Sequence, residues 1–136
     1  MNTMKLLTTD TRVPLVGLAG VEKVESLTLV GATANDFASA MAGSQARRLI
    51  ATFDHHAFIL FNTDGADNLN YRVLAALTID GDPPSNTTTL IASTALAFGA
   101  NTGIITLDPA CRWVNIQVQS AVADASAGYV LQYVVW

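Results

Sequence analysis

Strict alternation of apolar and polar residues near the C-terminus is the feature that most constrains the fold of this chain. Within Trp113–Gln119, the residues Val114, Ile116 and Val118 fall on one side, and polar residues fall on the other. Successive side chains of a β-strand point to opposite faces of the sheet, so this period of two is typical of a half-buried strand. A second strand is expected over Tyr129–Trp136, after a turn of small and polar residues. The last quarter of the chain therefore predicts two neighbouring strands.

Several other short segments are rich in apolar, β-branched or aromatic residues, and turns containing Gly, Pro, Asp and Asn separate them. They are Ser26–Val30, Arg48–Phe53, His56–Phe61, Leu69–Ile79, Thr87–Phe98 and Gly103–Leu107. This spacing predicts an all-β fold, a β-sandwich or jelly roll of short antiparallel strands with at most one short helix. The helix candidate begins after Asn35 and ends at Gly43, two residues that favour helix capping. Its apolar face would hold Phe37, Ala40 and Met41.

The chain divides near residue 45 into two parts of one domain. Residues 1–45 are expected to form an extended N-terminal arm, because short strand-like pieces alternate there with glycines. Two such pieces, Arg12–Leu18 and Ser26–Val30, are suited to pair with the sheet edge of a neighbouring subunit. Residues 46–136 are expected to form the β-sandwich core, and a chain of 136 residues is long enough to bury one.

Composition limits the partners of the chain. Hydrophobic residues make up 51% of the sequence and charged residues only 13%, which is about half the usual charged share. So apolar a chain is expected to be a homo-oligomer, and a trimer suits the three-fold positions of icosahedral shells, although the sequence does not choose three over two. The net charge of −4, with Arg47–Arg48 as the one basic pair, argues against nucleic-acid binding.

Membrane insertion and secretion are not expected either. The longest apolar runs, such as Ala57–Phe61, are far shorter than the roughly 20 residues that a membrane-spanning helix needs. The first residues lack an apolar stretch of signal-peptide length, which predicts synthesis in a cytoplasm. Cys111 is the one cysteine, so it is expected to be a small packing residue and not part of an internal disulfide.

His55 and His56 are the first candidates for a metal site. Adjacent residues of a strand point to opposite faces, so the two rings cannot readily hold one ion, and no Cys or HExxH spacing supplies further ligands. We expect one exposed histidine and one packed at the start of a strand. Serine or cysteine catalysis, a phosphate-binding loop and paired catalytic carboxylates all lack their spacing in this sequence. The sequence therefore predicts no enzymatic activity and no catalytic, cofactor-binding or metal-ligating residues.

Two loops concentrate oxygen-bearing side chains. One contains Asp64, Asp67, Asn68 and Asn70, and the other contains Asp80 and Asp82. Calcium favours such loops, but the spacing is not that of an EF-hand. Turns in which Asp and Asn side chains bond to the loop backbone are the simpler explanation, and calcium binding stays open.

Part of the chain resembles a known class of proteins. Phe61–Gly65 leading into Leu69–Val73, then Thr94–Gly99, Asp108–Pro109 and Arg112–Val118, is similar to small β-sandwich virion proteins of tailed bacteriophages. The resemblance covers roughly half of the chain and involves no catalytic motif. It implies a capsid decoration or cement protein on the virion surface, which binds the major capsid protein and stabilises the shell by bridging capsomers. It carries over no functional residues.

Contacts with other subunits are expected from residues of the arm and the closing strands, most of them apolar or aromatic. The interface candidates are Arg12, Val13, Leu15, Leu27, Leu29, Trp113 and Trp136. The alternative function is a receptor- or carbohydrate-binding β-sandwich of a phage tail or head fibre. Sugar-binding modules often place aromatic residues in exposed loops, whereas the tryptophans here and Tyr129 and Tyr133 fall within expected strands. That placement favours packing and subunit contacts.

Overall fold

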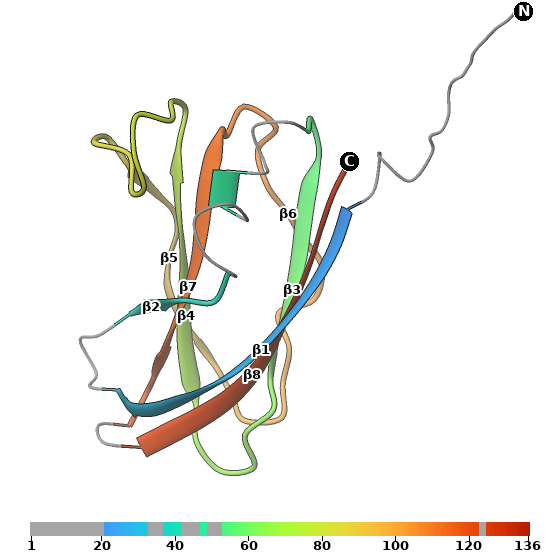
Figure 1. Ribbon diagram of the computed structural model, residues 1–136. Helices are drawn as coiled ribbons and strands as arrows, with labels where there is room; N and C mark the ends of the chain where they lie inside the picture. The colour runs from blue at the N-terminus through green and yellow to red at the C-terminus, as the bar shows by residue number, and fades with distance from the viewer. Residues whose placement is uncertain (1–20, 33–36, 42–46, 49–52, 123–124) are drawn as a thin grey trace, which may run out of the picture.

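The computed structural model describes residues 21–32, 37–41, 47–48, 53–122 and 125–136. Eight strands make up two layers that face each other (Figure 1). They are β1 Val21–Ala32, β2 Ala38–Ser39, β3 His56–Asn62, β4 Leu69–Ala76, β5 Thr88–Leu96, β6 Ile105–Thr106, β7 Trp113–Ser120 and β8 Ala125–Val135. The described residues contain no helix long and apolar enough to cross a membrane.

The strand order is that of a jelly roll. One sheet, here sheet A, has the order β1-β8-β3-β6, and the other, sheet B, has the order β2-β7-β4-β5. Every strand pair is antiparallel, and strands adjacent in a sheet are mostly distant in sequence, as in a double Greek key. The predicted all-β fold is confirmed.

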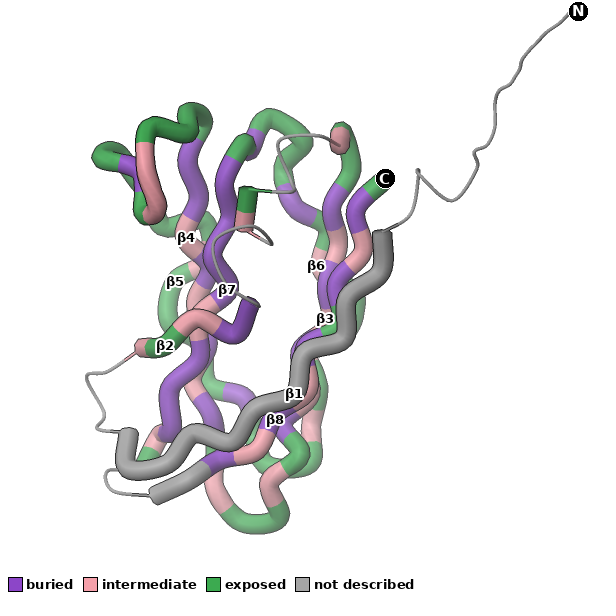
Figure 2. The backbone as a smooth tube through the Cα atoms, in the orientation of Figure 1, coloured by how far each residue is buried: buried purple, intermediate pink, exposed green. Residues whose placement is uncertain are grey.

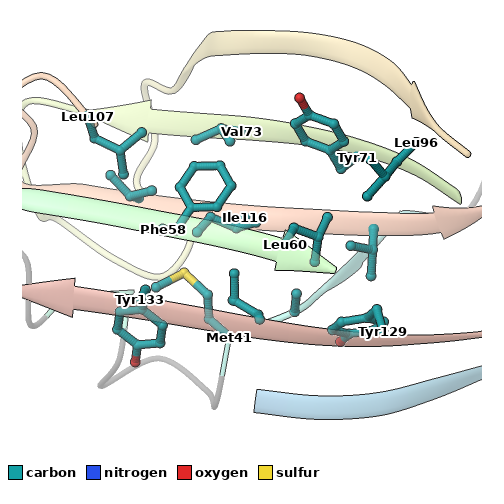
Figure 3. Packing of buried hydrophobic residues seen from close by; sticks show 14 of the residues in the cluster. Met41, Phe58, Leu60, Tyr71, Val73, Leu96, Leu107, Ile116, Tyr129 and Tyr133 are labelled. Carbon is teal, nitrogen blue, oxygen red and sulfur yellow. The ribbon is translucent and has the colours of Figure 1, made fainter. Parts of the chain in front are cut away.

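The core lies between the inner faces of the two sheets (Figures 2 and 3). Along β3 and β4, buried and half-buried residues alternate, so each strand gives one row of side chains to the core. Register places Tyr71 opposite Val118 and Val73 opposite Ile116, so the apolar rows of β4 and β7 coincide. In Figure 3, Phe58 and Leu60 of β3 lie against these rows from the other layer.

The predicted helix after Asn35 is wrong within the described part of that segment. Ala38 and Ser39 form β2 and lie opposite Val118 and Gln117 of β7. Ala40 and Met41, assigned to one helix face, are buried in the core instead. A helix of two turns is marginal in isolation, and the backbone bonds to β7 together with core burial outweigh its caps.

Strand ends differ from the expectation where loops intervene. The strand expected over Arg48–Phe53 is absent at both described ends, because Arg48 has a helical backbone and Phe53 lies outside any strand. β4 ends at Ala76 and not at Ile79, and β6 covers two residues of the five expected. Gly103 has a φ of 70°, a left-handed conformation that interrupts regular pairing before β6.

Residues 1–45 are predicted to form an extended arm, but the described part of this segment from Val21 to Ala32 is a strand of sheet A. Ser26–Val30 lies inside β1, which pairs with β8 of the same chain from Val21 to Ala32. A strand paired inside its own sandwich cannot also be a detached arm. The piece Arg12–Leu18 lies outside the described residues.

Candidate interaction surfaces

The outer face of sheet B carries polar side chains that bond to one another across the strands. Asn70 lies opposite Gln119, and its Nδ2 donates to Gln119 Oε1 at 3.3 Å. Arg72 lies opposite Gln117, and its Nε donates to Gln117 Oε1 at 2.7 Å. The Arg72 guanidinium also lies 4.2 Å from the centre of the Phe37 ring, a cation–π contact. We call this set the polar ladder.

Asp82 joins three distant segments at the end of the polar ladder. Its carboxylate accepts hydrogen bonds from Arg47 Nε at 3.0 Å and Arg47 Nη2 at 2.5 Å, and from Trp113 Nε1 at 2.9 Å. The two side chains of the ion pair are only 14% and 13% exposed. The Arg47 guanidinium, followed by the bond from Trp113, holds the pKa of Asp82 below its usual value despite the opposing effect of burial.

The same cluster continues into the sheet. Arg47 Nη1 donates to Ser39 Oγ at 3.1 Å, and Ser39 Oγ donates to Asn115 Oδ1 at 2.7 Å. A cleft of about 280 Å³ lies beside these residues, bordered also by Leu74 and Thr87. Ser39, Arg47, Asp82, Trp113 and Asn115 already bond to one another here, so these groups are engaged within the fold.

The outer face of sheet A has the opposite character. A shallow groove of about 170 Å³, here called the apolar groove, opens on this face. It is lined by Ala57, Phe58, Ile59, Ile104, Gln132 and Val134. Ile104 is 75% exposed, the most exposed large hydrophobic side chain among the described residues. Five of the six lining residues are apolar, so covering the groove would remove apolar surface from water, which lowers the free energy.

β5 is an open sheet edge. In the described part of the chain, β4 pairs with one side of β5 and no strand pairs with the other. Nearly all of its residues are exposed. No charged residue occurs from residue 83 to residue 107, whereas β1, the other long edge, contains Glu22, Lys23 and Glu25. Charges commonly protect edge strands from pairing with other chains, and β5 lacks them, although two register shifts twist it.

The two histidines lie as the sequence predicts, one exposed and one packed at the start of β3. The His55 ring stacks on Trp136 with centroids 5.2 Å apart, and the two backbones exchange hydrogen bonds of 3.0 and 3.1 Å. His56 is 2% exposed, and neither ring nitrogen has a hydrogen-bond partner in the described structure. Burial is the main cause that lowers the pKa of His56.

One aspartate in each acidic loop bonds within its own loop. Asp64 Oδ1 accepts from the N–H groups of Ala66 at 2.9 Å and Asp67 at 3.3 Å. Asp80 accepts from both the backbone and the hydroxyl of Ser85, which lowers its pKa. These are the turns expected from the sequence. Within the described ranges, no three His, Cys, Asp or Glu residues are grouped to hold a metal ion.

Cys111 is buried at the core, as expected for a packing residue. Burial raises the pKa of its thiol, and the nearby Asp108 adds to this effect. The neutral thiol is therefore favoured, which makes this side chain a poor nucleophile.

The predicted interface residues that the structure describes are spread over separate elements. Trp113 is 1% exposed and donates to Asp82, so it belongs to the fold and offers almost no surface to another chain. Trp136 is 45% exposed and stacks on His55 at the end of sheet A. Leu27 and Leu29 lie in β1, whose backbone pairs with β8. Arg12, Val13 and Leu15 fall outside the described residues.

Sequence reasoning missed the Arg47–Asp82–Trp113 cluster and the apolar groove. The cluster joins residues 35 and 31 positions apart, and no periodic pattern relates them. The groove needs Ile104 from a loop to lie beside β3 and β8. A sequence signal did exist for β5, because residues 83–107 form an uncharged stretch of apolar and hydroxyl-bearing residues.

No protein-family model matches the chain, and no curated protein is similar to it. Among solved structures, it is similar to a chain from the structure described as "Bacillus endospore appendages form a novel family of disulfide-linked pili". The TM-score is 0.48 with 13% sequence identity, and the match covers 93% of this chain and 97% of that chain. A similarity of this size carries no statement about function.

Proposed function

We propose that this protein is a non-enzymatic structural subunit that assembles through the open edge of β5. The observation that carries the proposal is a strand of nine residues, almost wholly exposed and free of charge, at the end of sheet B. A strand from another subunit would pair with its unpaired backbone groups and extend the sheet. Backbone pairing of this kind needs no reaction centre.

The remaining chemistry of the described surface supports the same proposal. The polar groups that form the polar ladder and the Asp82 cluster bond to one another, and Asp64 and Asp80 bond to their own loops. The features that stay available for a partner are therefore the backbone of the β5 edge and the apolar surface. Both favour contact with protein over contact with a small polar substrate.

In its finer form, the proposal is a capsid decoration protein. Its support is the resemblance of Phe61–Val73 and the later segments to tailed-phage virion proteins, together with the low charge. The homo-oligomer would be a trimer, and its partner would be the major capsid protein on the virion surface. Weak contacts repeated by symmetry would then give strong overall binding.

The coarser proposal is tested by adding charge to the edge. Ser93 and Ala95 are exposed on β5, so the double variant Ser93→Lys/Ala95→Lys should fold normally and lose assembly. The matched control is Ala66→Lys/Ala110→Lys, which adds the same charge in exposed turns. Light scattering coupled to gel filtration should give the subunit mass for the edge variant and the assembled mass for the control. Equal masses would contradict assembly through β5.

The finer proposal needs capsids. The intact chain should co-sediment with isolated capsids that lack it and should raise their melting temperature. Ordered self-assembly without capsid binding, seen by electron microscopy, would leave the structural role standing and rule out decoration. Binding to a glycan array without capsid binding would favour the receptor-binding alternative.

A further inference from the structure

We propose that residues 13–18 of the same molecule fold back over sheet A and fill the apolar groove. The groove is made by the half-buried Ala57, Ile59 and Val134, by the buried Phe58 and by the exposed Gln132 and Ile104. Its described lining contains no charged side chain and one polar residue, Gln132. Such a surface fits an apolar segment that brings no charge of its own.

The groove lies close to the point where residues 1–20 join the sandwich. Glu22, the second residue of β1, is level with Val134, and Val134 is level with Ala57. Neighbouring strands lie about 4.8 Å apart, so β3 is roughly 10 Å from β1 in this direction. Five extended residues span about 17 Å, so a chain that turns before β1 and crosses about 10 Å of sheet can reach the groove by residue 16.

The composition of the preceding segment fits that path. Residues 13–18 read Val-Pro-Leu-Val-Gly-Leu, and no charged residue occurs from residue 13 to residue 20. Gly17 and Gly20 can adopt the backbone conformations that a sharp reversal needs. In an extended chain Val16 and Leu18 would share one face and could enter the groove together. The tether of a few residues gives the segment a high effective concentration at the groove.

The inference is independent of assembly through β5. Docking of residues 13–18 concerns the outer face of sheet A, whereas the proposed assembly uses the edge of sheet B. The experiments can therefore be run on the Ser93→Lys/Ala95→Lys variant at low concentration. Failure of one proposal does not imply failure of the other.

Trypsin offers a direct test on the full-length chain, because Arg12 precedes the proposed docked segment. Cleavage needs several extended residues on both sides of the bond, so docking should protect the Arg12–Val13 bond. Ile104→Asp places a charge in the groove and should raise the cleavage rate at Arg12 about tenfold, because cleavage follows the population of the open form. Val122→Asp, which adds the same charge at an exposed apolar residue outside the groove, should leave it unchanged.

Cleavage after Lys5 serves as an internal reference, since that bond precedes the docked residues and should be cut equally in all three proteins. Circular dichroism should show the same fold in each. Equal rates at Arg12 in the unchanged chain and Ile104→Asp would overturn the proposal.

Cross-linking decides whether the occupant belongs to the same molecule. In a Cys111→Ala background, Val16→Cys with Ile104→Cys should be joined within one chain by a short bismaleimide. The control, Val16→Cys with Asp54→Cys, places the second thiol on an exposed residue near the same end of β3 but outside the groove. The groove pair should react at least tenfold faster, and Ile59→Asp should remove that advantage. Products of dimer mass, or equal rates for both pairs, would overturn docking within one chain.

Discussion

The outer faces of the two sheets have opposite chemistry. Sheet B presents Arg72 bonded to Gln117 and Asn70 bonded to Gln119, and these partners lie directly opposite each other on β4 and β7. Sheet A presents the apolar groove around Ile59 and Ile104. Polar side chains that lie opposite each other on neighbouring strands can form hydrogen bonds with one another on the same face of the sheet. Apolar side chains leave water only when another layer covers them, so the apolar groove is the part of sheet A where a covering segment would be favourable.

The largest expected effect comes from removing the Asp82 carboxylate, which accepts hydrogen bonds from Arg47 and Trp113 at the end of sheet B. Asp82→Ala leaves Arg47 and the Trp113 Nε1–H without their acceptor in a largely buried setting, so we expect a loss of about 3 kcal/mol in the free energy of unfolding. Urea denaturation measures it. Asp80→Ala, in the same loop but exposed, should cost clearly less. Equal losses would mean that the cluster adds nothing beyond loop structure.

The same residue predicts a response to acid. The pKa of Asp82 is lowered in the folded state, so its contribution is complete above the ordinary aspartate pKa of about 3.9 and is lost as the pH falls through the lowered value. Asp82→Asn should flatten the stability curve in that range. An unchanged curve would place the acid sensitivity elsewhere.

His56 extends the comparison to the start of β3 in sheet A, where its ring is buried and neither nitrogen has a hydrogen-bond partner among the described residues. Its pKa is lowered by burial, so below about pH 6.5 the unfolded chain binds a proton that the folded chain resists. Stability should therefore fall as the pH drops from about 6.5, by at most about 1.4 kcal/mol per pH unit, and stay level above it. His56→Phe should remove this slope and His55→Ala should keep it, measured by urea denaturation between pH 7 and pH 5.

The smallest expected effect is within the polar ladder. Gln117→Ala removes the acceptor of Arg72 Nε, for which we expect about 1 kcal/mol. A double-mutant cycle with Arg72→Met isolates the pair from the contact between Arg72 and Phe37. A coupling energy near zero would mean that water replaces this bond without cost. The polar ladder would then contribute little to the stability of sheet B.

The strand Trp113–Gln119 shows which features of burial the sequence can predict. Alternation in Trp113–Gln119 predicted that Val114, Ile116 and Val118 face the core, and all three are buried there. The same pattern predicted a solvated opposite face, yet Asn115 and Gln119 are buried as well. Alternation reports which side of a strand is apolar, and it contains nothing about a distant segment that covers the polar side.

The β2 segment and Trp113 show which features the sequence could not predict. Asn35 and Gly43 are sound capping residues, but Ala38 and Ser39 pair with β7 because backbone bonds and burial of Met41 outweigh a weak helix. Trp113 is an interface candidate in the sequence because it falls within an expected strand, a placement that favours packing or subunit contacts. Its partner, Asp82, lies 31 residues away and was assigned to a turn.

The sequence by itself determined the fold class, most of the strands and the turns that use Asp64 and Asp80, since all of these follow from local periodicity and local hydrogen bonding. Only the tertiary structure decided that β2 is a strand, that Arg47, Asp82 and Trp113 form one cluster, and that Ile104 borders a groove on sheet A. Each of these depends on which segments the jelly-roll topology brings together. Such pairings are long-range, and the energies that select them belong to the packed molecule and not to any stretch of its sequence.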